Sequence, residues 1–285
     1  MTHDLEWLLS LAVRAAAEAS RLVGSKRGTG FKVERKEGAD TLAAEVVTEV
    51  DRAAEALIRT HLMPTIGSGK LGFLGEESAD DKSRLRCEAF WCIDPIDGTL
   101  SFVRGSPGFS TSIALVARDG SPLIGVVADP LSGNLWAAAR GLGVTRNGTA
   151  FAASTTTSVF NLFADASFKD HPRFEECLQA MDRIGQALKL GPVVTHIGAG
   201  AVLNAISVLE NGPACYFKFR RPTGGGSLWD YAATACIYAE LERPAADLDG
   251  RPFDLNRADA TNMTHRGIVY ASAEEIATAV RAEFA

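Results

Sequence analysis

The chain has 285 residues, of which 46% are hydrophobic and 22% charged, and its formal net charge is -6 at pH 7. This composition is typical of a globular protein that buries one large core or two smaller ones. The acidic balance argues against a nucleic acid polymer as a partner, since that class needs a basic surface, and no apolar run is long enough to predict a membrane span.

Two amphipathic helices are predicted at the start of the chain. Apolar residues recur at helical spacing from Leu5 to Ala16, and again from Asp51 to Leu62. Acids and an arginine interrupt the first pattern, so it predicts a helix rather than an export signal. The charged, glycine-rich segment 24–41 predicts a hairpin or loop. Because the five cysteines are scattered and form no CxxC pair, a reduced, cytoplasmic location is expected.

Strand patterns follow in residues 90–140, where short segments rich in β-formers alternate with turn pairs such as Asp119-Gly120. They predict an antiparallel meander. Beyond residue 158 the two patterns alternate, with strands predicted at 192–197 and 214–219 and helices at 174–188, about 201–210 and after 229. We therefore expect an α+β domain over residues 1–155 and an α/β domain over residues 156–285.

The apolar segment 90–93 ends in the motif DPIDGT, which holds Asp94 and Asp97. Two carboxylates at the mouth of a sheet repel each other unless they share a cation. Their oxygens suit Mg²⁺, which takes its remaining ligands from water and a substrate phosphate. Gly98 and Thr99 would offer backbone N–H groups to that phosphate. Alone, however, the tetrapeptide DPID is better explained as a turn and a helix N-cap.

Two further acidic motifs accompany this one, namely GEE at residues 75–77 and WDYAA at residues 229–233. In their order, and in the separation of the first two, the three motifs resemble those of the inositol monophosphatase superfamily over nearly the whole chain. The resemblance implies an α/β fold layered as an αβαβα sandwich of the sugar-phosphatase type. It also implies magnesium-dependent phosphomonoester hydrolysis by an activated water, and a homodimer.

The resemblance further implies roles for single residues. The implied ligands of two or three Mg²⁺ ions are Glu76, Asp94, the carbonyl of Ile96, Asp97 and Asp230, with Glu77 beside them. Asp51 and Thr99 would position and deprotonate the attacking water. Without the resemblance, Asp51 is better explained as an acid favoured by the dipole at a helix start. The expected substrate contacts are Asp97, Gly98, Thr99, Gly200, Ala201, Lys218 and Arg220.

The substrate prediction depends on a departure from the inositol-handling members, which have a glutamate in the strand before WD. Here Lys218 stands at about that point, followed by Arg220 and Arg221. Cations beside a phosphate site favour a ligand with a second negative group, so the main prediction is a 3′(2′),5′-bisphosphate nucleotide. Inositol 1-phosphate or another sugar phosphate is the alternative, because the three cations are also explained as solvated loop residues. Either ligand is a small phosphorylated metabolite.

Rival functions have weaker support. The turn at residues 198–200 resembles that of a dinucleotide-binding oxidoreductase, but Leu203 occupies the third glycine position. A metal-binding scaffold without catalysis would leave the water-activating pair unexplained.

Two departures from the family also stand out. The helix after Asp230 lacks the usual glycines, and Lys32 and Lys36 are only candidates for the lysine of the loop before Glu45.

Overall fold

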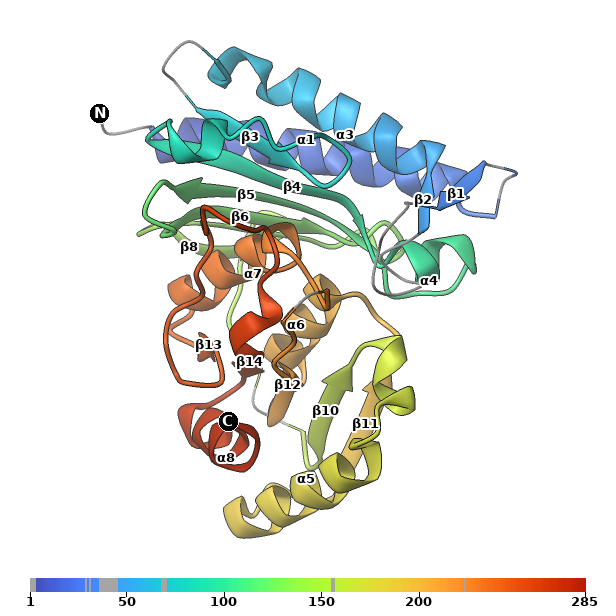
Figure 1. Ribbon diagram of the computed structural model, residues 1–285, viewed down its shortest axis with the longest axis vertical. Helices are drawn as coiled ribbons and strands as arrows, with labels where there is room; N and C mark the ends of the chain where they lie inside the picture. The colour runs from blue at the N-terminus through green and yellow to red at the C-terminus, as the bar shows by residue number, and fades with distance from the viewer. Residues whose placement is uncertain are drawn as a thin grey trace.

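The computed structural model describes residues 4–28, 30, 32–35, 46–67, 71–154, 157–222 and 224–285. Helix and sheet layers alternate along the long axis of the molecule (Figure 1). The helices, in layer order, are α1 (Leu5–Lys26) and α3 (Glu49–Leu62), then α6 (Ala201–Glu210) and α7 (Leu228–Glu240), then α5 (Phe174–Leu188) and α8 (Glu274–Phe284). A 7-stranded and a 5-stranded sheet separate them, which confirms the predicted αβαβα sandwich.

The 7-stranded sheet has the order β3-β4-β5-β6-β7-β8-β9. Its strands are β3 (Gly72–Gly75), β4 (Ala89–Asp97), β5 (Ser110–Ala117), β6 (Pro122–Ala128), β7 (Leu135–Ala139), β8 (Gly143–Arg146) and β9 (Thr149–Ala150). β3 is parallel to β4 and all later pairings are antiparallel, so the predicted meander is confirmed. A separate antiparallel pair, β1 (Val33–Arg35) and β2 (Val46–Thr48), precedes α3.

The 5-stranded sheet has the order β11-β10-β12-β14-β13. Its strands are β10 (Phe160–Ala164), β11 (Val193–Ile197), β12 (Ala214–Lys218), β13 (Ala245–Ala246) and β14 (Ile268–Ala271). β10 is parallel to both neighbours, so β10 and β12 end at the same edge. Helix α5 has the predicted bounds, whereas β10, β14 and α8 were not predicted. Short helical segments are α4 (Thr99–Val103), η1 (Met63–Thr65), η2 (Ser83–Leu85), η3 (Ala166–Asp170) and η4 (Thr264–Arg266).

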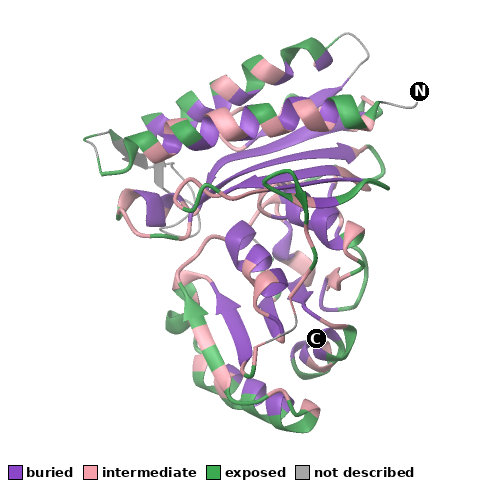
Figure 2. Cartoon of the chain, turned by 180° about the vertical axis from the view of Figure 1, so that it is seen from behind, coloured by how far each residue is buried: buried purple, intermediate pink, exposed green. Residues whose placement is uncertain are grey.

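Helices cover both faces of the 7-stranded sheet, and its central strands are buried (Figure 2). All nine residues of β4 are buried. Within it, Trp91 is fully buried and its Nε1 donates to Thr65 Oγ1 at 2.8 Å, so its one polar group is satisfied. No helix among the described residues combines the length and apolarity that a membrane crossing needs.

Helix α7 belongs to the second half of the sequence but packs on β5 and β6 of the first sheet. The contact is close, since a Cβ at Gly125 of β6 would lie 2.1 Å from the carbonyl oxygen of Ala233. The predicted domain boundary falls at residues 155 and 156, outside the described residues, and the division stays a prediction.

The substitution Gly125→Ala tests this contact between β6 and α7. We expect it to lower the free energy of unfolding by about 1–3 kcal/mol, because the added methyl group forces the helix away from the sheet. Urea denaturation gives this value. Gly30→Ala is the control, since a Cβ there meets no atom within 4 Å. Equal effects of both substitutions would contradict the role of close packing.

Candidate active site

Strand β4 carries Asp94 and Asp97 towards the start of α7, where Asp230 lies. Residues three apart on a regular strand point to opposite faces. The pairing of β4 with β5 shifts register between Asp94 and Asp97, however, and such a bulge redirects side chains. One carboxylate oxygen from each of Asp94, Asp97 and Asp230 lies within 4.8 Å of the other two. The structure thus brings together three acids that the sequence motifs singled out.

Backbone amides hold each of these carboxylates in place. Asp94 Oδ1 accepts a hydrogen bond from the Ile96 amide at 3.0 Å. Asp230 Oδ2 accepts from the Ser227 amide at 2.6 Å and closes a capping box at the start of α7. The two oxygens of Asp97 accept from the amides of Ala201 and Val202, each at 3.0 Å. Asp97 therefore joins the first sheet to the start of α6.

Burial, together with repulsion between the carboxylates, sets the electrostatics of this cluster. Burial raises the pKa of Asp94 well above its usual range, and the carboxylates of Glu76, Asp97 and Asp230 raise it further. Burial and Asp230 likewise raise the pKa of Asp97. Burial raises the pKa of Asp230 too, although Lys218 opposes that shift. The donors are all oxygen atoms and carry uncompensated charge, so they fit a hard divalent cation.

Glu76 and Glu77 follow β3. The Glu76 side chain lies within hydrogen-bonding reach of Asp94, which places this predicted ligand at the acidic cluster. Glu77 directs its backbone amide to Glu55 Oε2 at 2.8 Å. The buried Glu55 is a residue that sequence reasoning missed. A Cβ at Gly75 would come within 2.3 Å of its carboxylate, so the glycine of the GEE motif makes room for it.

Asp51 and Thr99 lie next to each other beside the cluster. The Thr99 hydroxyl is 3.3 Å from Asp51 Oδ1 and 3.0 Å from the Ile96 carbonyl oxygen. Thr48 donates its amide to Asp51 Oδ2 at 2.8 Å and completes a capping box at the start of α3. Burial raises the pKa of Asp51 to about 6, although the hydrogen bonds from Thr48 oppose the shift. The helix-start explanation and the predicted pairing with Thr99 are therefore compatible.

Several of the predicted substrate contacts lie near the acidic cluster. Gly200 and Ala201 lie against Asp97, and a Cβ at Gly200 would come within 2.2 Å of Asp97 Oδ2. Gly98, with φ of 84°, caps α4 directly after Asp97. Lys218 also lies near the cluster, because its positive charge acts to lower the pKa of Asp97 and of Asp230.

Two of the predicted cations are engaged in ion pairs. Lys218 Nζ lies 2.8 Å from Asp165 Oδ2 and donates to the Gly225 carbonyl oxygen at 2.7 Å. Burial opposes its charged form, but Asp165 more than offsets this, and the pKa of Lys218 is raised. Arg220 forms an exposed pair with Asp249 at 2.7 Å. Both side chains thus already have a carboxylate partner. Lys32 is exposed, and Lys36 lies outside the described residues.

Asp165 is a second residue that the sequence analysis missed. It follows β10, and its Oδ1 accepts from the Tyr216 hydroxyl at 2.9 Å and from Asn204 Nδ2 at 3.1 Å. With 29% of its side chain exposed, the carboxylate remains accessible. The available signal was an acid after the β-forming run 159–164, since ligands gather where parallel strands end.

Comparison with known proteins agrees with this geometry. Residues 4–283 match the model of the inositol monophosphatase family. Inositol monophosphatase 1 of Solanum lycopersicum is 36% identical over 266 residues, which cover 91% of this chain and 92% of the relative. The chain belongs to the inositol monophosphatase family. It is therefore a phosphomonoesterase of that metal-dependent family, and the acidic cluster could bind metal.

Two more proteins extend this comparison. Inositol monophosphatase 1 of Bos taurus is 27% identical, with coverage of 97% of this chain and 96% of that one. A solved structure of extragenic suppressor protein SuhB from Bartonella henselae is 23% identical and has the same fold, with a TM-score of 0.72 over 97% of this chain and 98% of the other. The two curated relatives, from Solanum lycopersicum and Bos taurus, are both named inositol monophosphatases.

The raised pKa of Asp51 has a consequence for the metal-free protein. A carboxyl group with a raised folded-state pKa binds protons more tightly in the folded state, so its contribution to stability falls as pH rises from the usual value towards about 6. We expect wild type to lose about 2 kcal/mol of unfolding free energy relative to Asp51→Asn between pH 4 and pH 7. Urea denaturation in EDTA measures the difference. A constant difference across this range would contradict the raised pKa.

Proposed function

We propose that this phosphomonoesterase uses Mg²⁺ to hydrolyse the monophosphate of a polyhydroxylated alcohol, with inositol monophosphate as the representative substrate. The observation that carries the proposal is that two sets of side chains lie next to each other. These are the three carboxylates whose oxygens lie within 4.8 Å of one another, and the neighbouring Asp51 and Thr99. A cation site beside a buried carboxylate and a hydroxyl matches the needs of phosphate ester hydrolysis by water.

The residues that would hold two or three Mg²⁺ ions are Glu76, Asp94, Asp97, Asp230 and the carbonyl of Ile96. Bound there, Mg²⁺ supplies positive charge that offsets the carboxylates and the phosphate oxygens and makes water more acidic. The chain itself orients and deprotonates the water. The Thr99 hydroxyl can donate to Asp51 Oδ1 while its oxygen accepts from water, and a carboxylate with a pKa of about 6 is a suitable base near neutral pH.

The ion pair of Lys218 and Asp165 supports a polyol rather than a second phosphate. A lysine that already has a carboxylate partner offers less net charge to an anion than a free lysine does. The pair instead presents an accessible carboxylate and a fixed ammonium group, which can accept from and donate to hydroxyl groups. Asn204 and Tyr216 hold the carboxylate in position through its other oxygen.

A phosphate-release assay with and without EDTA tests the proposal. We expect activity on inositol 1-phosphate that requires Mg²⁺ and exceeds the activity on adenosine 3′,5′-bisphosphate. Asp94→Asn and Asp230→Asn should each abolish it, because each removes an anionic oxygen from the shared cation site. Full turnover in excess EDTA would exclude the magnesium mechanism. Preference for the bisphosphate, lost selectively in Lys218→Ala, would restore the nucleotide prediction.

Thr99→Ala and Asp51→Asn test the assignment of the water-activating pair. We expect kcat to fall by about 10²–10⁴, the scale for a positioned general base, with little change in magnesium affinity. Steady-state kinetics and calorimetric Mg²⁺ titration separate the two quantities. Wild-type kcat in both variants would require another base, and a parallel loss of Mg²⁺ binding would place the pair among the metal ligands.

A further inference from the structure

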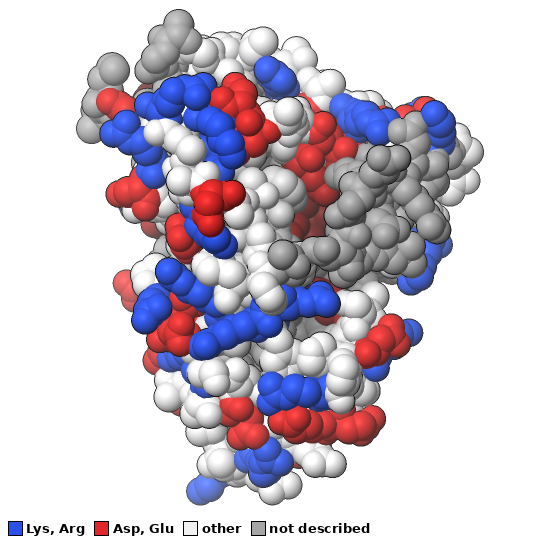
Figure 3. Space-filling model, in the orientation of Figure 1, with Lys and Arg blue, Asp and Glu red and all other residues white. Residues whose placement is uncertain are grey.

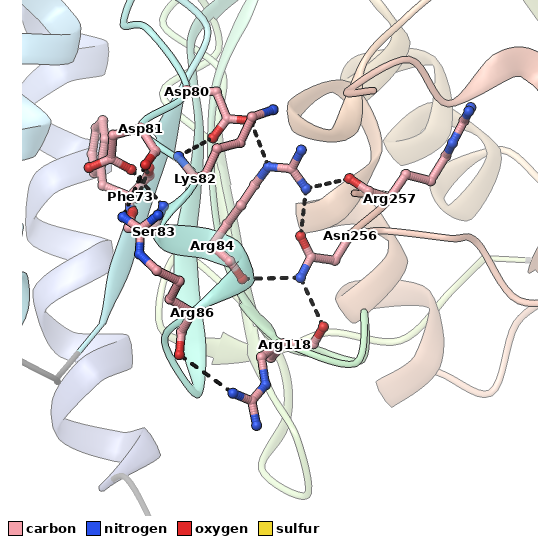
Figure 4. Close-up of polar contacts among 10 residues, drawn as sticks. All are labelled: Phe73, Asp80, Asp81, Lys82, Ser83, Arg84, Arg86, Arg118, Asn256 and Arg257. Atoms are coloured by element: carbon pink, nitrogen blue, oxygen red, sulfur yellow. Dashed lines mark hydrogen bonds and ion pairs between the residues drawn. The ribbon is translucent and has the colours of Figure 1, made fainter. Parts of the chain in front are cut away.

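Arg84 is a fully buried cation in the segment that follows Glu76 and Glu77 (Figure 4). Its Nε donates to Asp80 Oδ2 at 2.9 Å, within the same segment. Its Nη2 is buried and has no hydrogen-bond partner among the described residues. A buried guanidinium that remains incompletely satisfied is costly, so its retention requires a structural or functional reason.

The other end of Arg84 reaches the C-terminal half of the chain. Its Nη1 donates to Asn256 Oδ1 at 2.8 Å and to the carbonyl oxygen of Arg257 at 2.5 Å. Asn256 Nδ2 in turn donates to the Arg84 carbonyl oxygen at 3.1 Å and to that of Arg118 at 2.8 Å. Figure 4 shows these groups pointing toward one another between the two segments. The pair is thus reciprocal, with side chain and backbone of Arg84 both engaged.

The segment 251–263 that receives these bonds contains neither helix nor strand, apart from one isolated bridge between Asn262 and Ser227. Arg257 Nη1 donates to the Asn262 carbonyl oxygen at 3.3 Å. The Leu228 amide donates to the Thr261 carbonyl oxygen at 2.9 Å. An irregular segment has no ladder of its own, so specific side-chain contacts set its position.

This segment contacts the residues that cap α7. The bridge to Ser227 and the bond from Leu228 place it directly beside the start of the helix. The Ser227 amide donates to Asp230 within the capping box. A continuous path of contacts therefore joins Arg84, Asn256 and the irregular segment to Asp230. Arg84 is also linked to Glu76, because both residues lie in the segment that follows β3.

The segment 83–85 is itself fixed on the first sheet. Ser83 Oγ accepts from the Phe73 amide at 3.1 Å, and a Cβ at Gly72 would come within 2.9 Å of the Ser83 backbone. Arg84 thus projects from a base that is packed against β3, the strand that Glu76 follows. The Arg84 side chain therefore links the segment that follows Glu76 to segment 251–263, which contacts the start of α7 near Asp230.

We propose that Arg84 is a positioning residue that fixes Asp230 relative to Glu76 and Asp94 and so sets the affinity of the acidic cluster for Mg²⁺. It touches neither the cluster nor a substrate, and it acts through Asn256 and segment 251–263. The inference rests on the proposed function, because it takes the acidic cluster to be the magnesium site. Supporting contacts of metal ligands typically change affinity by about 10–100-fold when they are removed.

Calorimetric titration with Mg²⁺ alone tests the proposal on the full chain. We expect Arg84→Met and Asn256→Leu each to weaken Mg²⁺ binding by about 10–100-fold, and the double variant to bind no more weakly than the worse single one, because both break the same link. Asn256→Leu keeps the buried charge paired with Asp80 and is the second variant should Arg84→Met fail to fold.

Two control variants separate positioning from general destabilisation. Arg86→Met alters an arginine of the same segment whose side chain donates to the Asp81 carbonyl oxygen at 3.0 Å, and it should bind Mg²⁺ like wild type. Val280→Ala in α8 removes buried surface from a hydrophobic cluster that holds no residue of segments 83–85 or 251–263, and supplies a fold of lowered stability. Wild-type Mg²⁺ affinity in Asn256→Leu, or an equal loss in Val280→Ala, would overturn the proposal.

Hydrogen exchange of the metal-free protein gives a readout that does not depend on Mg²⁺. Amides of residues 227–231 should exchange faster in Asn256→Leu than in wild type, while those of α8 should not change. Unchanged exchange at residues 227–231 would overturn the link from Arg84 to α7. Failure of the wild-type protein to bind Mg²⁺ would instead overturn the proposed function, with the exchange result still deciding the structural link.

Discussion

Repulsion among the carboxylates of Asp94, Asp97 and Asp230 is the constraint on which the rest of this structure depends. Burial raises the pKa of all three groups, neighbouring carboxylates raise those of Asp94 and Asp97 further, and a compact fold would normally separate such groups. Here a strand bulge and the first turns of α6 and α7 hold them together. The backbone amides at these helix starts stabilise the negative charge in part, and a bound cation would complete the compensation.

The two sheets are joined through the helices α6 and α7, which also carry parts of the acidic cluster or its supports. Asp97 accepts from the start of α6, while Asp230 caps α7, which packs on β6 next to Gly125. Figure 3 shows acidic and basic side chains interspersed on the face in view, so no single charge covers that whole face. The acidic cluster thus destabilises the fold locally, and the packing of the layers offsets this cost.

Substrate recognition is where sequence reasoning and structure differ most. The sequence predicts that Lys218 binds phosphate, because it stands at about the position of the glutamate of inositol-handling members and is followed by Arg220 and Arg221. In the folded chain its nearest carboxylate is Asp165, which belongs to the unpredicted strand end of β10. Arg220 points to a separate acid, Asp249. A cation that already has a carboxylate partner is less available to a ligand. For Lys218 and Arg220 that partner comes from another segment of the chain.

The sequence alone determined the family, the helix and strand alternation, the order of the acidic motifs and the composition of the candidate metal site, because these depend on local spacing and residue chemistry. It could not determine that Asp94 and Asp97 turn to one point, that Glu55 and Asp165 support the site, or that Arg84 reaches Asn256. Those features arise when strand register, helix starts and an irregular segment from distant parts of the chain meet. Only tertiary packing decides which buried charges acquire partners, because desolvation and distance together set their energy.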